Sequence, residues 1–331
     1  MLNDEKKFKK GSINYNLIDF TPSEKNASRM EFKTIGQIIA RARLEKRPLV
    51  VVEGKDDVPI YEQIAKKVNK SVFVRAIETI PNYSPGCFHV KKFIKDAQSE
   101  INKASENEKY IIGIIDRDAS FFRNEIEEMK GLFVLKAYSH ESHFVTKPNL
   151  EYALHNLLSS NFGINDNIID FIFANYDNSV TEYYYYSLEA LKNACDETYE
   201  AEIGYAHTYG HINNLNDLRE KIDNKKNELD NFALEIGVFI QNPISIIKGK
   251  WLLDLFIDKT YESILELSNF CSSNNLIKGQ QRCSYCQSNK PDMCSWKPKK
   301  HHTDIMYRGY ILQFFNEEEV GYIFDKFRAL A

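Results

Sequence analysis

The sequence predicts an α/β protein: a parallel sheet covered by helices, followed by an α-helical region that carries a cysteine-rich insert. Three observations support this. In residues 30–147, short apolar runs rich in Val and Ile alternate with segments of helical periodicity, as in a parallel sheet with crossover helices. In residues 148–331, helical periodicity dominates. Within this second region, residues 271–304 are irregular and contain clustered cysteines.

The elements of the first region can be assigned in chain order. Strands are predicted at 48–52, 71–77, 110–115 and 132–137, and helices at 31–46, 56–68 and 90–104. Residues 1–29 mix Lys, Asn and Ser with few apolar positions, so we expect a flexible N-terminal arm there. In the second region, helical periodicity is clearest at 150–156, 165–174 and 216–235.

Composition limits the location and the partners of the chain. It has 331 residues, 43% of them hydrophobic, which is enough for a sizeable core, and a net charge of −4. No apolar run reaches the ~18 residues that span a bilayer, and no apolar segment follows the lysine-rich start as in a signal peptide. We therefore expect a cytoplasmic protein without membrane contact. Because the chain is mildly acidic, nucleic acid would have to bind a local basic patch.

Acidic residues stand where two predicted strands end. Glu53 and Asp57 follow strand 48–52, and Asp116 and Asp118 follow strand 110–115. Residues i and i+2 of an extended chain point the same way, so Asp116 and Asp118 can face one cleft. Clustered carboxylates favour a hard cation such as Mg²⁺ or Mn²⁺, which binds phosphate oxygens and activates water. Lys55 is placed to neutralise charge on a phosphate. The alternative is that these are ordinary polar residues at loop mouths and helix caps.

A second candidate metal site lies in the insert. Cys283, Cys286 and Cys294 are close in sequence and are followed by His301. A Cys-x-x-Cys pair with two later soft ligands is typical of structural Zn²⁺ sites, which can hold a segment that has no core of its own. Cys271 competes with His301 for the fourth position. The remaining alternative is a loop of reduced, unligated thiols.

The insert also carries positive charge. Lys297, Lys299 and Lys300 are interleaved with the aromatic residues Trp296 and Tyr285. Basic side chains bind phosphates and aromatic rings stack on unpaired bases, so this patch is a candidate nucleic-acid-binding surface suited to a looped RNA. The alternative is a merely solvated charged face.

Two segments resemble a known fold. Val51-Val-Glu53-Gly-Lys-Asp-Asp57 and Ile114-Ile-Asp116-Arg-Asp118 are similar to the two signature motifs of the Toprim fold, over roughly residues 48–145. That fold is Rossmann-like and occurs in topoisomerases, primases, RNase M5-type maturases and OLD-family nucleases. More closely, the chain resembles the AriB-type Toprim effectors of PARIS anti-phage systems. Supporting segments are residues 53–61, 138–143 and 248–253.

The resemblance implies a metal-dependent nuclease that serves as the toxic effector of an antiviral defence system. Such an effector is held by a partner ABC-type ATPase, is released when a phage protein is sensed, and then cleaves host tRNA in an abortive infection. By matching position, Glu53, Asp116 and Asp118 would be the Toprim acids and Asp57 an additional ligand. Glu141 stands where the family often has a Glu-Asn pair, with Ser in place of Asn, and would complete the metal shell. An active homodimer is expected from the family.

Other functions remain as alternatives. An OLD-type DNA-nicking nuclease would use the same acids, and a non-catalytic Toprim regulatory subunit would keep the fold without turnover. No Walker sequence is present, so ATP hydrolysis would require a separate chain. The pair His140 and His143 is interpreted as orienting Glu141 or capping the loop that follows.

Overall fold

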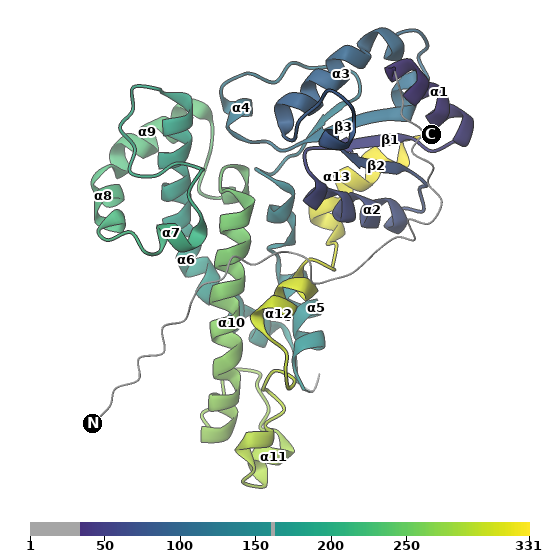
Figure 1. Cartoon of the computed structure of the whole chain (residues 1–331). Coiled ribbons are helices and arrows are strands. Elements are labelled where there is room, and N and C mark those ends of the chain that lie inside the picture. The colour runs from purple at the N-terminus through teal and green to yellow at the C-terminus, as the bar shows by residue number, and fades with distance from the viewer. Residues whose placement is uncertain (1–33, 160–162) are drawn as a thin grey trace, which may run out of the picture.

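The computed structural model describes residues 34–159 and 163–331, and the predicted N-terminal arm lies outside these residues (Figure 1). The predicted α/β class is confirmed. A four-stranded, fully parallel sheet has the order β2-β1-β3-β4. Its strands are β1 (Leu49–Val52), β2 (Phe73–Ala76), β3 (Ile111–Ile115) and β4 (Leu132–Val134).

Strand β4 is shorter than the predicted 132–137. The N–H of Leu135 still donates to the carbonyl of Ile115, but the N–H of Lys136 donates to the hydroxyl of Tyr322, which comes from the last helix. The sheet ladder therefore stops because a distant side chain takes over the backbone hydrogen bond.

Both faces of the sheet are covered, so its central strands are apolar throughout. One face packs against α1 (Ile35–Glu45) and α3 (Cys87–Ile101), and the other against α2 (Val58–Lys67) and the helical region. The single glycine of β3, Gly113, is required by this packing. A Cβ at this position would lie 2.7 Å from Cγ1 of Ile94 and 2.8 Å from Cγ1 of Val90, so α3 can approach the sheet only because that atom is missing.

The second region is helical, as the sequence predicts. Its helices are α5 (Lys147–Leu157), α6 (Asp166–Cys195), α7 (Tyr209–Ile212), α8 (Leu218–Asn224), α9 (Lys226–Ile236), α10 (Gly249–Ser273), α11 (Ser284–Gln287), α12 (Asp304–Ile311) and α13 (Glu317–Arg328). The long helices α6 and α10 pack side by side through aromatic contacts such as Tyr176 with Phe256. None of the helices within the described residues combines the length and the apolar character needed to cross a membrane.

The last helix returns to the sheet. Helix α13 packs on α2 (Figure 1). The rings of Phe327 and Tyr61 stack there at a centroid distance of 6.2 Å. One continuous core of buried residues joins a face of the sheet to the helices that follow it. The two regions recognised in the sequence therefore share their hydrophobic interior, and Tyr322 of α13 lies beside the carboxyl end of β4.

Candidate functional site

The candidate site lies at the carboxyl ends of β1 and β3, which are neighbours in the sheet. Glu53 follows β1 and Asp116 follows β3. The N–H of Asp116 donates a hydrogen bond of 2.8 Å to Oε1 of Glu53. Cys87, at the start of α3, also donates its backbone N–H to Glu53. The ends of two strands and one helix therefore position the Glu53 carboxylate.

Asp118 is held differently from Asp116. Its Oδ1 accepts hydrogen bonds from N and Oγ of Ser120, at 2.8 and 2.5 Å, and so caps the short helix α4 (Ala119–Phe122). Its Oδ2 accepts a weak hydrogen bond from Sγ of Cys87 at 3.5 Å. The helix-cap role considered for these acids thus applies to Asp118. Its negative charge still acts on the site, because it helps to raise the pKa of Glu53.

Asp57 faces the site from the 3₁₀ helix η1 (Lys55–Asp57). Its Oδ2 accepts a hydrogen bond of 2.9 Å from the N–H of Gly54, and its Oδ1 lies 3.2 Å from Nδ1 of His140. Lys55, in the same turn, is exposed to solvent. The turn after β1 therefore carries the hydrogen-bonded carboxylate of Asp57 and, two residues before it, the solvent-exposed ammonium group of Lys55.

Glu141 joins this group from the 3₁₀ helix η4 (His140–Phe144). Its Oε2 lies 3.7 Å from Nδ1 of His140 and accepts a hydrogen bond of 2.6 Å from Oγ of Ser139. The imidazole of His140 thus lies between two carboxylates, those of Asp57 and Glu141. Gly249, the first residue of α10, is packed against the same place: a Cβ there would lie 2.0 Å from Oγ of Ser139 and 3.0 Å from Oε2 of Glu141.

Burial and mutual repulsion shape the charge of the two strand-end acids. Burial, followed by the charges of Asp118 and Asp57, raises the pKa of Glu53 to about 7. Burial, followed by the charge of Glu53, raises the pKa of Asp116 well above its usual range. Each carboxylate therefore disfavours ionisation of the other, which is the expected behaviour of clustered acids without a bound cation.

The pair His140 and Glu141 shows the opposite behaviour. Burial acts to lower the pKa of His140, but the charge of Glu141 and the hydrogen bond to Asp57 outweigh it and raise the pKa to about 9. Burial acts to raise the pKa of Glu141, but the charge of His140 and the hydrogen bond from Ser139 hold it below its usual range. An imidazolium cation therefore neutralises this side of the site.

The carboxylates are oxygen ligands of the kind that a hard cation binds, but no three of them lie close enough to surround one position. In the described part of the chain, ligand atoms of three or more residues lie within 4.8 Å of one another only among cysteines. Mg²⁺ is commonly bound through one or two carboxylates, with water completing an octahedral shell. Glu53 and Asp116 are the candidate pair, because the N–H of Asp116 contacts the Glu53 carboxylate and the charge of Glu53 acts on the carboxyl group of Asp116.

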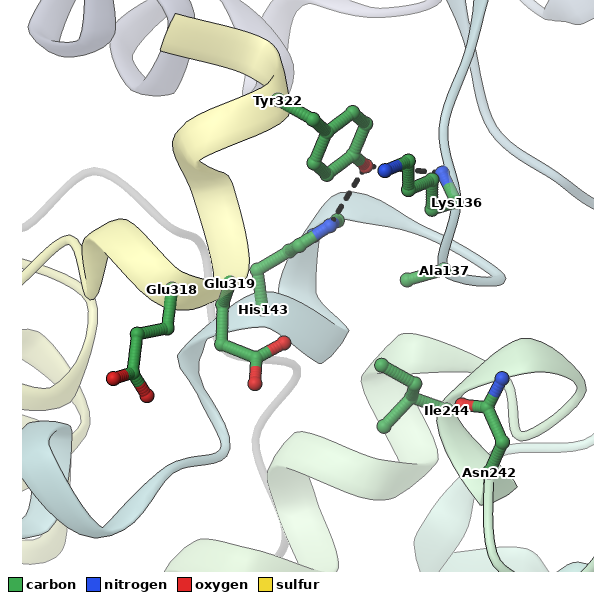
Figure 2. A pocket seen from close by; sticks show the side chains of 8 residues that line it. All are labelled: Lys136, Ala137, His143, Asn242, Ile244, Glu318, Glu319 and Tyr322. Carbon is green, nitrogen blue, oxygen red and sulfur yellow. Dashed lines mark hydrogen bonds between the residues drawn. The ribbon is translucent and has the colours of Figure 1, made fainter.

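A cavity of about 350 Å³ lies beside this site (Figure 2). Tyr322 and His143 form one wall: Oη of Tyr322 accepts the N–H of Lys136 at 3.0 Å and lies 2.8 Å from Nε2 of His143. Nδ1 of His143 lies 3.1 Å from the carbonyl oxygen of His140, so the wall is connected to the backbone of His140. Sequence reasoning missed Tyr322, since no motif marks it and it is far along the chain.

The cysteines of the insert form a second group. Cys271, Cys283, Cys286 and Cys294 are all buried, and their sulfur atoms lie within 4.8 Å of one another, so they could hold a metal ion. Of the two candidates for the fourth ligand, Cys271 from the last turns of α10 belongs to this group, whereas His301 is exposed and lies outside it.

The predicted basic patch is only partly available to a ligand. Nζ of Lys299 donates to the carbonyl of Asn156 at 2.7 Å, and the chain from Lys297 to Lys299 pairs with residues 157–159. Trp296 is 1% exposed and donates its Nε1–H to the carbonyl of Gln281, so it cannot stack on a base as predicted. Tyr285 is 40% exposed and Lys300 is exposed.

Neither the carboxylates nor the cysteines can be assigned through a relative. No family model matches the chain, and no curated protein matches it.

Proposed function

We propose that this chain is a metal-dependent nuclease that hydrolyses phosphodiester bonds at the carboxyl ends of β1 and β3. The observation that supports the proposal most strongly is the hydrogen bond from the backbone N–H of Asp116 to the Glu53 carboxylate, which joins two half-buried acids from neighbouring strand ends. Clefts at the carboxyl ends of parallel strands are where α/β proteins bind ligands. Paired acids in such a cleft favour phosphoryl chemistry, because they bind the cations that phosphate esters require.

The acids would hold Mg²⁺ or Mn²⁺ in a Toprim-like arrangement. Glu53 and Asp116 would be the direct ligands, and Asp57 and Asp118 would add charge or bind through water. When bound, the metal would polarise a phosphate oxygen and lower the pKa of a coordinated water.

Other residues of the site would position the acids and the substrate. His140 holds Asp57 and Glu141 in place through its contacts of 3.2 and 3.7 Å. Gly54 lacks a Cβ, which leaves room for a phosphate next to the turn. Lys55, exposed in the same turn, would bind a phosphate oxygen and stabilise the charge that develops on it.

The proposed substrate is RNA, and host tRNA in particular. This part of the proposal is supported by the motifs shared with AriB-type effectors, which would also make the chain a cytoplasmic effector controlled by a partner ABC-type ATPase and active as a homodimer. The exposed Lys300 and the half-buried Lys297 would contribute to tRNA binding, whereas Lys299 is engaged by Asn156.

An OLD-type nuclease that nicks DNA is the second candidate, because it would use the same acids. A non-catalytic regulatory subunit is the third. Incubating the purified chain with tRNA and with supercoiled plasmid, in Mg²⁺, in Mn²⁺ and in chelator, separates these three functions. We expect the chain to cleave tRNA only when the metal is present. Nicking of the plasmid would instead indicate the DNA nuclease, and cleavage of neither substrate would indicate the regulatory subunit.

The catalytic acids are tested with Asp116→Asn. We expect this variant to lose cleavage, while Asp170→Asn keeps it, because Asp170 is an exposed acid paired with Lys147. Co-expression with the neighbouring ATPase controls for restraint or release by the partner. If wild-type protein, with or without that partner, cleaved no nucleic acid, or if Asp116→Asn cleaved as well as wild type, the proposal would be wrong.

A further inference from the structure

We propose that Cys271, Cys283, Cys286 and Cys294 form a closed, purely structural Zn²⁺ site that joins the end of α10 to the insert. This inference is independent of the proposed nuclease function. Cys271 belongs to the last turns of α10, Cys283 caps α11, Cys286 lies within α11, and Cys294 follows the 3₁₀ helix η6 (Pro291–Met293). Four sulfur atoms from three separate elements therefore converge on one buried point.

The distances match a tetrahedral zinc ion. With Zn–S bonds of about 2.3 Å, a tetrahedral site places its sulfur atoms about 3.8 Å apart. The Sγ atoms of Cys283 and Cys294 are 3.8 Å apart, and all four ligand atoms lie within 4.8 Å of one another. A disulfide needs about 2.0 Å between its sulfur atoms, so this pair is not one. An iron–sulfur cluster would hold its thiolates farther apart, because iron and sulfide ions fill the space between them.

Backbone N–H groups point at the sulfur atoms. The N–H of Cys283 lies 3.3 Å from Sγ of Cys271, and the N–H of Cys286 lies 3.5 Å from Sγ of Cys283. Hydrogen bonds of this kind favour a negatively charged acceptor, which is the thiolate form that binds zinc. The local backbone is therefore arranged for metal-bound sulfur rather than for free thiols.

The insert needs such a link, because its own elements are short. Helix α11 has four residues and η6 has three, and the segment between α10 and α12 includes no named strand within the described residues. Direct contacts to α10 include the hydrogen bond of 2.7 Å from Nε2 of Gln280 to the carbonyl of Leu267. A metal bound by four residues would supply the remaining stabilisation.

Four thiolates leave no open coordination position, so this metal would not bind substrate. The insert, with α11, also lies at the end of the molecule opposite the sheet, remote from β1 and β3 (Figure 1). The effect of a bound metal would be structural. Cys294 precedes the stretch of chain that pairs with the end of α5 through the bridge between Leu158 and Pro298. Zinc would thereby fix α10, the insert and α5 relative to one another.

The inference is tested by measuring the zinc content of the purified full-length chain by mass spectrometry under native conditions and by elemental analysis. We expect about one zinc ion per chain in the wild type. Cys271→Ser should lose most of this zinc, whereas His301→Ala and Cys195→Ser should retain it. Cys195 is the matched control, because it is a free cysteine in α6 outside the group.

A measurement on the wild type covers the case in which Cys271→Ser does not fold. Replacing the metal with Co²⁺ should produce thiolate-to-cobalt charge transfer and the intense visible absorption of a tetrahedral site, with four thiols protected from modification until the metal is removed. Wild-type protein with a small fraction of an equivalent of zinc and four freely reactive thiols would overturn the inference. Loss of zinc from His301→Ala, with retention in folded Cys271→Ser, would overturn the ligand set.

Discussion

The N–H of Asp116 donates its hydrogen bond to the carboxylate of Glu53 across 63 positions of sequence. This bond joins the ends of two neighbouring parallel strands and brings two half-buried acids together. Because the two carboxylates disfavour each other's ionisation, a divalent cation would stabilise both of them.

Replacing Glu53 with Gln should weaken Mn²⁺ binding. Gln keeps an oxygen that can accept the N–H of Asp116, so the local geometry is preserved while one negative ligand is lost. We expect at least a tenfold loss of affinity, about 1.4 kcal/mol. Isothermal titration of Mn²⁺ into both proteins measures it, with Glu127→Gln as control, since Glu127 is an exposed partner of Lys95. Equal affinities for wild type and Glu53→Gln would contradict a metal site here.

The stability of the metal-free protein should depend on the ionisation of Glu53. Its pKa is raised from 4.5 to about 7 in the folded state. Between these values the folded protein keeps a proton that the unfolded chain has lost, so stability falls as the pH rises through this window.

Glu53→Gln removes this dependence. The free energy of unfolding of the variant minus that of wild type should therefore increase by about 2 kcal/mol from about pH 5 to about pH 8. Urea unfolding in the presence of chelator at both pH values measures the difference. Added Mg²⁺ should stabilise the wild type at the higher pH more than the variant. A pH-independent difference between the two proteins would show that Glu53 ionises normally.

His140 should stabilise the fold through its charge. Its pKa is raised from 6.5 to about 9 by Glu141 and Asp57 against the effect of burial. The stabilisation is therefore fully present below about pH 6.5 and is lost as the pH rises through about 9. We expect His140→Asn to cost about 2 kcal/mol at neutral pH and much less at high pH.

The control for this prediction is His155→Asn. The side chain of His155 is 41% exposed and its Nε2 lies 3.9 Å from Oε1 of Glu151, so its replacement should change the free energy of unfolding by a few tenths of a kcal/mol at most. Chemical unfolding across the pH range compares the two variants. A cost of His140→Asn that stayed constant up to high pH would mean that packing, not charge, is what the imidazole contributes.

Gly249→Ala should disturb the site from the start of α10. The added Cβ would lie 2.0 Å from Oγ of Ser139, so that hydroxyl has to rotate away from Glu141. We expect a loss of about 1–3 kcal/mol in stability. Gly309→Ala is the control, because it is also a helical glycine but a Cβ there meets nothing within 4 Å.

The control should instead gain up to about 1 kcal/mol, as Ala is the better helix former. Thermal unfolding of both variants, together with Mn²⁺ titration, measures the outcome. If Gly249→Ala were as stable as Gly309→Ala, the close contact between α10 and Ser139 would not exist in solution.

Reversing the charge of Lys300 should reduce nucleic-acid binding if the insert contacts the substrate. Lys300 is exposed, so Lys300→Glu should fold normally. We expect weaker binding of tRNA. The slope of the logarithm of the binding constant against the logarithm of the salt concentration should become shallower by about one unit. Fluorescence anisotropy over a salt series measures both, with the exposed Lys130→Glu as control. Unchanged affinity and slope would remove the insert from the binding surface.

Particular residues show how far sequence reasoning reached. The apolar runs 48–52 and 110–115 predicted buried strands because a run of that length and composition has few other stable environments, and the acids that follow them mark the sheet edge. The fourth member of the cysteine group stayed open in the sequence between Cys271 and His301. Cys271 is separated from Cys283 by a helix end and a loop, and sequence spacing alone does not show how that loop folds back. His301 is close to Cys294 in sequence, but it lies outside the cysteine group in space.

The sequence by itself determined the α/β class, the positions of the strands and the placement of acids after them, because apolar periodicity and strand ends are local properties. Only the tertiary structure decided that His140 lies between Asp57 and Glu141, and that Tyr322 takes the N–H of Lys136 from 186 positions away. These contacts join residues brought together by the packing of whole elements, and no local pattern in the chain encodes such distances.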